Sequence, residues 1–225
     1  MKKIIAAVGV AMCSLTANAQ FWVGGNVGFS RFENSSELET ESESAESKPV
    51  RLYFGPKIGY SFNDKWAVAL SLSYSHGTNE NKASSSDYIS KSNQHYFDIT
   101  PFVRYSFAKS GIVSFHVDGG MTFGYSKSEF DYGYNSDIDY ERRYPYSNRE
   151  TNMFNVGLRP GMQIDLSDHV ALELNLGFFG YSWHRTEALD EYYDIERNHR
   201  STMTGSDFGL TGNGGDVNLG VIWKF

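Results

Sequence analysis

In eight segments of the chain every second residue is apolar. In the last segment, "VNLGVIWKF" (217–225), Val217, Leu219, Val221, Trp223 and Phe225 share one face, and smaller or polar residues hold most of the other. Successive side chains of a strand point to opposite sides, so this pattern predicts a strand with one apolar face. The other seven segments are residues 21–32, 51–62, 66–74, 94–107, 111–125, 152–166 and 170–181. A period of two over eight segments predicts an all-β fold.

The connections between these segments alternate in length. Long polar connections cover residues 33–50, 75–93, 126–151 and 184–213, and short turns lie at Asn63–Lys65, Ala108–Ser110 and Ser167–His169. This order predicts an eight-stranded antiparallel up-and-down barrel with both chain ends on the short-turn side. Transmembrane barrels of bacterial outer membranes have short periplasmic turns and long extracellular loops.

The apolar faces carry aromatic residues at both ends of the strands. The aromatics near the short turns are Phe21, Phe62, Trp66, Phe107, Trp223 and Phe225, and those near the long loops are Phe29, Tyr74, Phe97, Tyr125, Phe154 and Phe178. Two aromatic girdles around an aliphatic band predict a barrel whose apolar face meets lipid. The alternative is a soluble barrel with an apolar interior, but its exterior would be dense in Lys and Glu, and the polar faces here are rich in Gly, Ser and Asn.

Three prolines fall inside predicted strands. Pro56, Pro101 and Pro160 lie on the apolar face, where the missing N–H removes a bond of the strand ladder. We expect β-bulges at these positions, because a bulge tolerates an unpaired residue.

The first nineteen residues have the form of an export signal. Lys2 and Lys3 precede the apolar stretch "IIAAVGVAMCSL", and Ala17 and Ala19 form an A-x-A cleavage site. We therefore predict a cleaved signal peptide over 1–19, secretion through the general pathway, and a barrel domain over 20–225. Cys13, the only cysteine, leaves with the signal. Cleavage also changes the formal charge from −7 to −9, and an acidic chain argues against nucleic-acid binding.

From "FWVGGNVGFS" to the terminal "VNLGVIWKF", the pattern resembles the OmpX/OmpA-type eight-stranded barrels of the outer membrane β-barrel family. The resemblance covers the whole mature chain and implies an integral outer membrane protein. We expect a monomer without a cofactor or metal. It implies that Val221, Trp223 and Phe225 form the terminal signal read by the barrel-assembly machinery, after periplasmic chaperones have carried the chain. It also places the protein among bilayer lipids and lipopolysaccharide.

Seven titratable residues alternate onto the inward face near mid-height. An eight-stranded barrel is just wide enough to be filled by its own side chains. Opposite charges enclosed there should pair, since an unpaired buried charge is costly. We expect a structural plug, with a narrow ion path as the alternative. The residues are Lys57, Asp98, Arg104, His116, Asp118, Arg159 and Glu173.

The long connections suggest functions at the outer surface. Residues 126–151 and 184–213 are dense in Tyr and Arg, which are enriched where proteins bind partners. They could equally stabilise their own hairpins, part of which we expect to extend beyond the membrane. Residues 33–50 carry six Glu, which indicates a solvated loop; a divalent-ion site is the alternative, but the spacing is not that of an EF-hand.

One short motif raises the question of catalysis. His199-Arg200-Ser201, with Glu196 nearby, is an H-x-S of the kind seen in lipid A deacylases. We place it in a loop instead of on a lipid-facing strand, which departs from that family, and we predict that the protein is not an enzyme. The predicted function is structural, with surface loops for adhesion, contact with lipopolysaccharide or macromolecules, and envelope integrity. An outer-leaflet lipid A-modifying enzyme and a narrow channel are the alternatives.

Overall fold

The computed structural model describes residues 20–31, 34–37, 44–47, 50–83, 88–134, 146–191, 199–211 and 218–225. The predicted signal segment, with Ala17 and Ala19, lies outside these residues, as does the side chain of Phe29. Within the described ranges, no helix is both long enough and apolar enough to cross a membrane.

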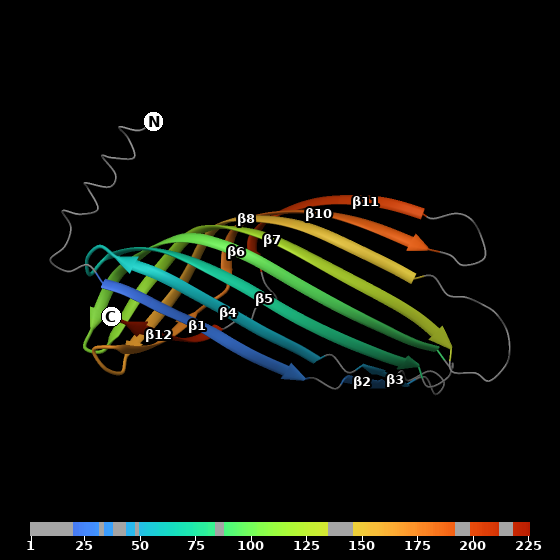
Figure 1. Cartoon of the computed structure of the whole chain (residues 1–225), viewed down its shortest axis with the longest axis horizontal. Coiled ribbons are helices and arrows are strands. Elements are labelled where there is room, and N and C mark those ends of the chain that lie inside the picture. Colours follow the sequence, from blue (N-terminus) through green and yellow to red (C-terminus); the bar gives the residue numbers. More distant parts are fainter. Residues whose placement is uncertain are drawn as a thin grey trace.

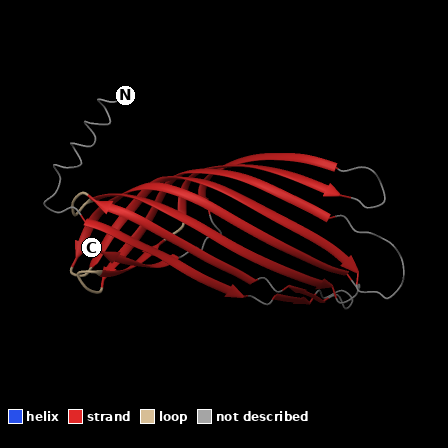
Figure 2. Ribbon diagram, viewed as in Figure 1, coloured by secondary structure: helices blue, strands red, loops and turns tan. Residues whose placement is uncertain are grey.

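The described residues form twelve strands (Figure 2). Their bounds are β1 Gln20–Arg31, β2 Asn34–Glu37, β3 Ser44–Ser47, β4 Val50–Ser61, β5 Trp66–Ala83, β6 Tyr88–Ser110, β7 Val113–Tyr134, β8 Tyr146–Asp165, β9 Val170–Asn175, β10 Phe178–Glu191, β11 His199–Thr211 and β12 Asn218–Lys224.

The strands form one antiparallel sheet that closes on itself (Figure 1). Its order is β11-β10-β8-β7-β6-β5-β4-β1-β12-β9, and β9 also pairs with β8. β9 and β10 together form the seventh strand of the wall, and β11 and β12 form the eighth. The small β2–β3 hairpin is added to β5. Closure joins Trp22–Gly25 of β1 to Val221–Lys224 of β12. The predicted eight-stranded antiparallel barrel is therefore confirmed.

The distribution of buried residues is the reverse of that in a soluble protein. In the described part, the buried side chains are mostly polar, including Asp98, Arg104 and Glu173, and only Trp22, Ala67, Ala171 and Ile222 are buried and apolar. The exposed large side chains are apolar, as at Ile58, Val103 and Leu158. Since apolar surface is stable only away from water, this barrel needs lipid around it, and the soluble alternative is excluded.

The wall strands reach further into the long connections than the apolar pattern alone predicts. β5 continues to Ala83, β7 to Tyr134 and β10 to Glu191, while β11 occupies His199–Thr211. The extensions expected for 126–151 and 184–213 are present, and 75–93 is also largely strand. Polar cross-strand pairs sustain them: the Thr151 and Thr186 hydroxyls, for example, are 2.9 Å apart.

The seventh strand contains a change of phase that the sequence did not reveal. β8 pairs Gly161 with Asn175 but Leu158 with Phe179, so the opposing strand has one extra residue between these pairs. Such a bulge exchanges the two faces of the strand beyond it. Our assignment of Phe178 to the lipid-facing girdle is therefore wrong: its ring faces the lumen, and Phe179, 47% exposed, faces lipid instead.

The prolines give a mixed result. At Pro56 the β4–β5 ladder lacks two pairs, and at Pro101 the β6–β7 ladder does the same, but neither register shifts. The prediction of bulges at these two prolines is wrong. The strand ladder instead has a gap at each of them, because proline has no N–H to donate. Near Pro160 a bulge exists in the facing strand, where the Leu176 N–H donates to the Pro160 carbonyl at 2.9 Å.

Candidate functional site

An apolar layer lies in the lumen toward the short-turn end. It consists of Trp22, Ala171 and Ile222, with Phe102 and Ala69 packed against it. The Trp22 ring fits because its neighbour in register, Gly59, has no side chain. A Cβ on Gly59 would lie 2.1 Å from Cζ2 of Trp22, so only glycine is compatible with this packing.

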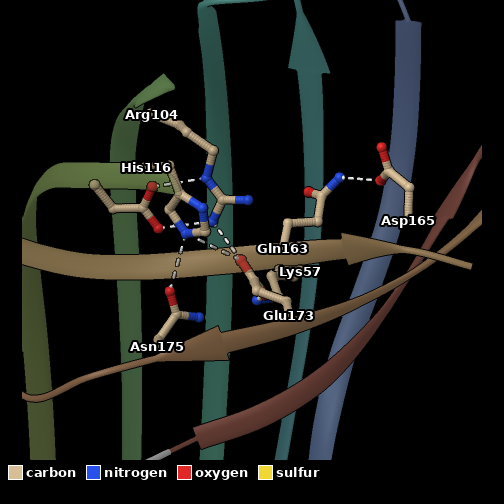
Figure 3. A network of polar contacts seen from close by, with 8 residues as sticks. Lys57, Arg104, His116, Gln163, Asp165, Glu173 and Asn175 are labelled. Carbon is tan, nitrogen blue, oxygen red and sulfur yellow. Dashed lines mark hydrogen bonds and ion pairs between the residues drawn. The ribbon is translucent and has the colours of Figure 1, made fainter. Parts of the chain in front are cut away.

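A layer of ion pairs lies next to these apolar groups, and Figure 3 shows its Lys57, Arg104 and Glu173 side chains close together. Arg104 of β6 donates two hydrogen bonds to the carboxylate of Asp118, from Nε and Nη2, each 2.7 Å long. The same guanidinium donates to Glu173 of β9, and Lys57 of β4 donates to the other oxygen of Glu173. Arg104 also lies 5.6 Å above the Trp22 ring, a cation–π distance. We call Lys57, Arg104, Asp118 and Glu173 the charge layer.

Glu173 is the centre of the charge layer. Its side chain is fully buried, and each of its two carboxylate oxygens contacts a cation from a different strand, Lys57 of β4 or Arg104 of β6. His116 completes the surroundings: its Nε2 donates to the side-chain Oδ1 of Asn175 at 3.2 Å and lies 3.8 Å from Oε1 of Glu173. Two cations and two carboxylates balance each other, so the layer can remain enclosed without an unpaired charge.

The remaining two predicted residues lie above this layer, toward the long loops. Asp98 is buried and accepts a hydrogen bond from Thr100 at 3.2 Å. Arg159 lies directly opposite Asp118 in the register of β7 and β8, but Asp118 is engaged by Arg104. The structure thus brings five of the seven predicted residues into one cluster and leaves Asp98 and Arg159 on the wall beyond it.

The charge layer separates two cavities in the lumen. The outer cavity, about 420 Å³, is lined by Lys57, Asp98, Arg159 and a set of hydroxyl and amide groups. The inner cavity, about 430 Å³, opens at the short-turn end and is lined by Trp22, Arg104 and Lys224 among others. No lining residue is shared between them. Glu173 bonds to Lys57 on the outer side and to Arg104 on the inner side.

A second ion-pair cluster lies at the short-turn end. Asp165, the last residue of β8, accepts from Lys224 at 2.6 Å and from Gln163 at 2.8 Å, and Lys109 is 3.5 Å away. Lys224 belongs to the strand that closes the barrel, so this cluster joins the closing strand to β8 from inside the lumen.

Three buried groups have the residue types and spacing of metal ligands. Atoms of His116, Asp118 and Glu173 lie within 4.8 Å of one another. Both carboxylates, however, already accept hydrogen bonds from Arg104, and Glu173 also from Lys57. A cation there would have to displace two protein cations, so this donor set does not fit a resident metal.

The H-x-S motif lies on a strand, which corrects our placement of it in a loop. His199–Thr211 form β11, and Ala188 of β10 is paired with Ser201. The Arg200 guanidinium makes an ion pair with Glu187 at 3.0 Å. Glu196 and the His199 side chain lie outside the described residues.

The three predicted residues of the terminal signal face outward along β12. Val221, Trp223 and Phe225 are 50%, 49% and 66% exposed. The N–H of Phe225 donates to the Phe21 carbonyl at 3.0 Å, and the two rings lie 5.9 Å apart. The chain end is therefore part of the seam between the first and last strands.

Reasoning from alternation missed the apolar lumenal residues. Trp22 and Ile222 lie on the inward face by their position, but we grouped them with small and polar neighbours and gave them no role. The available signal was their size: a large apolar side chain on a face of Gly, Ser and Asn must pack against something. Asn175 was also missed, although it lies two residues from Glu173 on the same face.

An inside-out barrel with a polar lumen and an apolar exterior defines the class of integral outer membrane proteins. The family model "Outer membrane protein beta-barrel domain" matches residues 16–183, and the chain belongs to this family. The search of curated protein sequences gave no match.

A solved structure shows the same fold. A major outer membrane protein from Thermus thermophilus aligns with a TM-score of 0.51 at 11% identity, covering 92% of this chain and 99% of that one. Two further alignments have lower scores. OprG from Pseudomonas aeruginosa aligns with a TM-score of 0.47 at 16% identity, over 93% and 96% of the two chains. Neisserial surface protein A aligns with a TM-score of 0.36 at 16% identity, over 92% and 99%.

Proposed function

We propose that this protein is a non-catalytic outer membrane barrel, closed by its charge layer, that acts through its long-loop end. The charge layer is the observation that carries the proposal. A solute crossing the lumen would have to break the contacts of Glu173, whose side chain has no exposed surface. Removing one partner of a buried ion pair costs about 3–5 kcal/mol, and this cost opposes passive flow.

The long-loop end is suited to contacts outside the bilayer. β6, β7 and β8 have 23, 22 and 20 residues, whereas a membrane-spanning strand needs about 9–11. The excess projects beyond the aromatic girdle of Tyr74 and Phe97. These projecting strands and the Tyr- and Arg-rich segments 126–151 and 184–213 are the surfaces we assign to extracellular macromolecules.

The outer face just beyond the girdle supports contact with lipopolysaccharide. His76 of β5, His95 of β6 and Lys127 of β7 are consecutive partners in register. The rings of His76 and His95 lie 4.5 Å apart, and the Tyr74 hydroxyl is 3.0 Å from Nδ1 of His95. The two imidazoles, together with the Lys127 ammonium, which also pairs with Glu129 at 2.6 Å, suit the phosphates of an anionic lipid.

Conductance measurements test closure of the lumen. The purified protein in a planar bilayer should carry no steady ion current, because the charge layer lies between the two lumenal cavities. A sustained single-channel current in the wild-type protein would contradict the proposal and favour the narrow channel. The lipid A mass profile of cells with and without the gene should be identical; a changed acylation pattern would favour the enzyme.

Binding by intact cells tests the role of the loops. Cells carrying the protein should retain extracellular macromolecules that cells with shortened 126–151 and 184–213 segments do not retain. Equal retention, with both proteins equally abundant in the outer membrane, would remove the adhesive role. We expect biogenesis to depend on periplasmic chaperones and the barrel-assembly machinery in either case.

A further inference from the structure

The outer cavity has the dimensions and walls of a small-molecule site. Its volume of about 420 Å³ lies at the small end of the range for ligand pockets. Hydroxyl and amide groups dominate its walls, from residues such as Thr122, Asn155 and Ser182, and the Phe178 ring forms part of one side. Since the charge layer separates it from the inner cavity, we call the outer cavity a cup whose floor is the charge layer.

Of the two cations on this wall, Arg159 is the one that makes no direct hydrogen bond or ion pair among the described residues, although it interacts electrostatically with Asp98. Arg104 and Arg159 both lie opposite Asp118 in register, one on each neighbouring strand. Arg104 takes both oxygens of that carboxylate, each at 2.7 Å. Arg159 makes no hydrogen bond or ion pair in the described part of the chain, although its guanidinium could donate five hydrogens.

The other charged groups of the cup are already engaged. Lys57 is bound to Glu173, and Asp98 accepts hydrogen bonds from Thr100, Tyr96 and Ser73. With Lys57 balanced inside the charge layer, Arg159 and Asp98 are the remaining charges of the wall, and they interact electrostatically without a direct ion pair. The hydrogen-bond donors of Arg159 are unused within the described residues, so they are available to an anion from outside the chain.

The bulge in the seventh strand positions the ring beside this guanidinium. Arg159 lies between Leu158 and Gly161, opposite the extra residue of the facing strand, and the phase change there turns Phe178 inward. An aromatic ring, several hydroxyl and amide groups and one free guanidinium together suit a molecule with an apolar face, hydroxyls and one acidic group. A sugar ring with a carboxylate has these features.

We propose that the outer cavity binds a small hydroxylated anion of the sugar-acid class, with its carboxylate on the Arg159 guanidinium. A guanidinium binds a carboxylate or a phosphate through two parallel hydrogen bonds. A sugar phosphate shares this chemistry, so the experiment must separate the two sources. The site is a cup without an exit through the charge layer, and its occupancy requires no conductance.

Calorimetric titration of the purified barrel in detergent tests this site. D-glucuronate should bind saturably, and D-glucose, which lacks the charge, should bind at least about tenfold more weakly, because a hydrogen bond to a charged group contributes about 1.5–3 kcal/mol. Glucose 6-phosphate is the third probe. If it binds more tightly than glucuronate, the anion class stands and the acid group is a phosphate; equal binding of glucose and glucuronate overturns the proposal.

Two variants locate the binding. Arg159→Gln should lose glucuronate binding, whereas Arg185→Gln, which removes an equal charge from a half-exposed arginine paired with Glu187 outside the lumen, should keep it. Unchanged binding in Arg159→Gln would overturn the proposal. If that variant fails to fold, the wild-type protein still decides: the Nε–H resonance of Arg159 should shift on addition of glucuronate and stay in place on addition of glucose.

Discussion

At the scale of single residues, Glu173 differs from the surface carboxylates because the two cations that depend on it are enclosed with it. Glu173→Gln leaves Lys57 and Arg104 with less compensation in an enclosed space. We expect the free energy of unfolding to fall by about 3 kcal/mol or more. The measurement is the urea midpoint of the barrel in detergent or lipid vesicles, followed by the heat-dependent gel shift of the folded form.

Glu187→Gln is the matched control. Glu187 also contacts two cations, Arg185 and Arg200, each at 3.0 Å, but on exposed surface. Exposed pairs contribute about 0–1 kcal/mol, so this variant should unfold close to the wild-type midpoint. If the two variants shift the midpoint equally, the charge layer is solvated and does not act as a buried pair.

A second residue-scale prediction concerns the packing of Trp22. Gly59→Ala places a methyl group where the indole lies, so the ring must move. We expect a loss of about 1–3 kcal/mol in stability, typical of overpacking, and a change in tryptophan fluorescence of the folded state. Gly77→Ala is the control, because a Cβ there would have its nearest neighbour at an ordinary 3.6 Å. Identical midpoints would show that the lumen accommodates the methyl group.

Sequence reasoning could place charges on the inward face but could not pair them. Alternation along the strands placed both Arg104 and Arg159 on the inward face, and both are neighbours of Asp118 in register. Which arginine bonds to the Asp118 carboxylate depends on side-chain rotamers and on the position of Glu173, which lies on a distant strand. Neither can be read from the residues next to either arginine in the sequence. That Asp118 bonds to Arg104 and not to Arg159 could therefore be seen only in three dimensions.

At the scale of elements, the apolar alternation located the membrane-spanning part of every strand. It failed where strands leave the bilayer, since polar alternation on both faces is hard to distinguish from a loop. It also failed at the bulge after Asn175, because one extra residue shifts the phase without changing composition. The assignment of Phe178 depended on that phase and was wrong for this reason.

The closing strand β12 gives the element-scale prediction. Deleting Phe225 removes its hydrogen bond to Phe21 and a lipid-facing ring, and it also removes the residue that the assembly machinery is expected to read. We expect a large fall in inserted protein in cells and an accumulation of unfolded periplasmic chain. Folding of the purified chain into detergent should change much less, as judged by the heat-dependent gel shift in both settings.

Two outcomes of the same experiment would contradict the predicted role of Phe225 as an assembly signal. If cells insert the shortened chain as well as the intact one, Phe225 acts only as a girdle residue. Equal losses in cells and in detergent would instead place the whole effect on the seam between β1 and β12.

At the scale of the whole molecule, the prediction concerns orientation. Protease added to intact cells should cut within 126–151 or 184–213 and leave the turn at Asn63–Lys65 intact. Bacterial barrels carry long loops outside and short turns in the periplasm. Mass spectrometry of the fragments identifies the sites, and protease added after disruption of the outer membrane is the control. Cleavage of intact cells only at the short turns would reverse the orientation.

The position of Glu173 in the ring of strands has a mechanical consequence. β9 is separated from β4 by β12 and β1, and from β6 by β7 and β8. The bonds of Glu173 to Lys57 and Arg104 therefore run across the diameter instead of around the circumference. A cylinder joined only by ladder bonds between neighbours can flatten into an ellipse when lipids and adjacent proteins press on it unevenly. Two cross-links from one wall to points on either side of the opposite wall resist that flattening, so the barrel should keep a round cross-section.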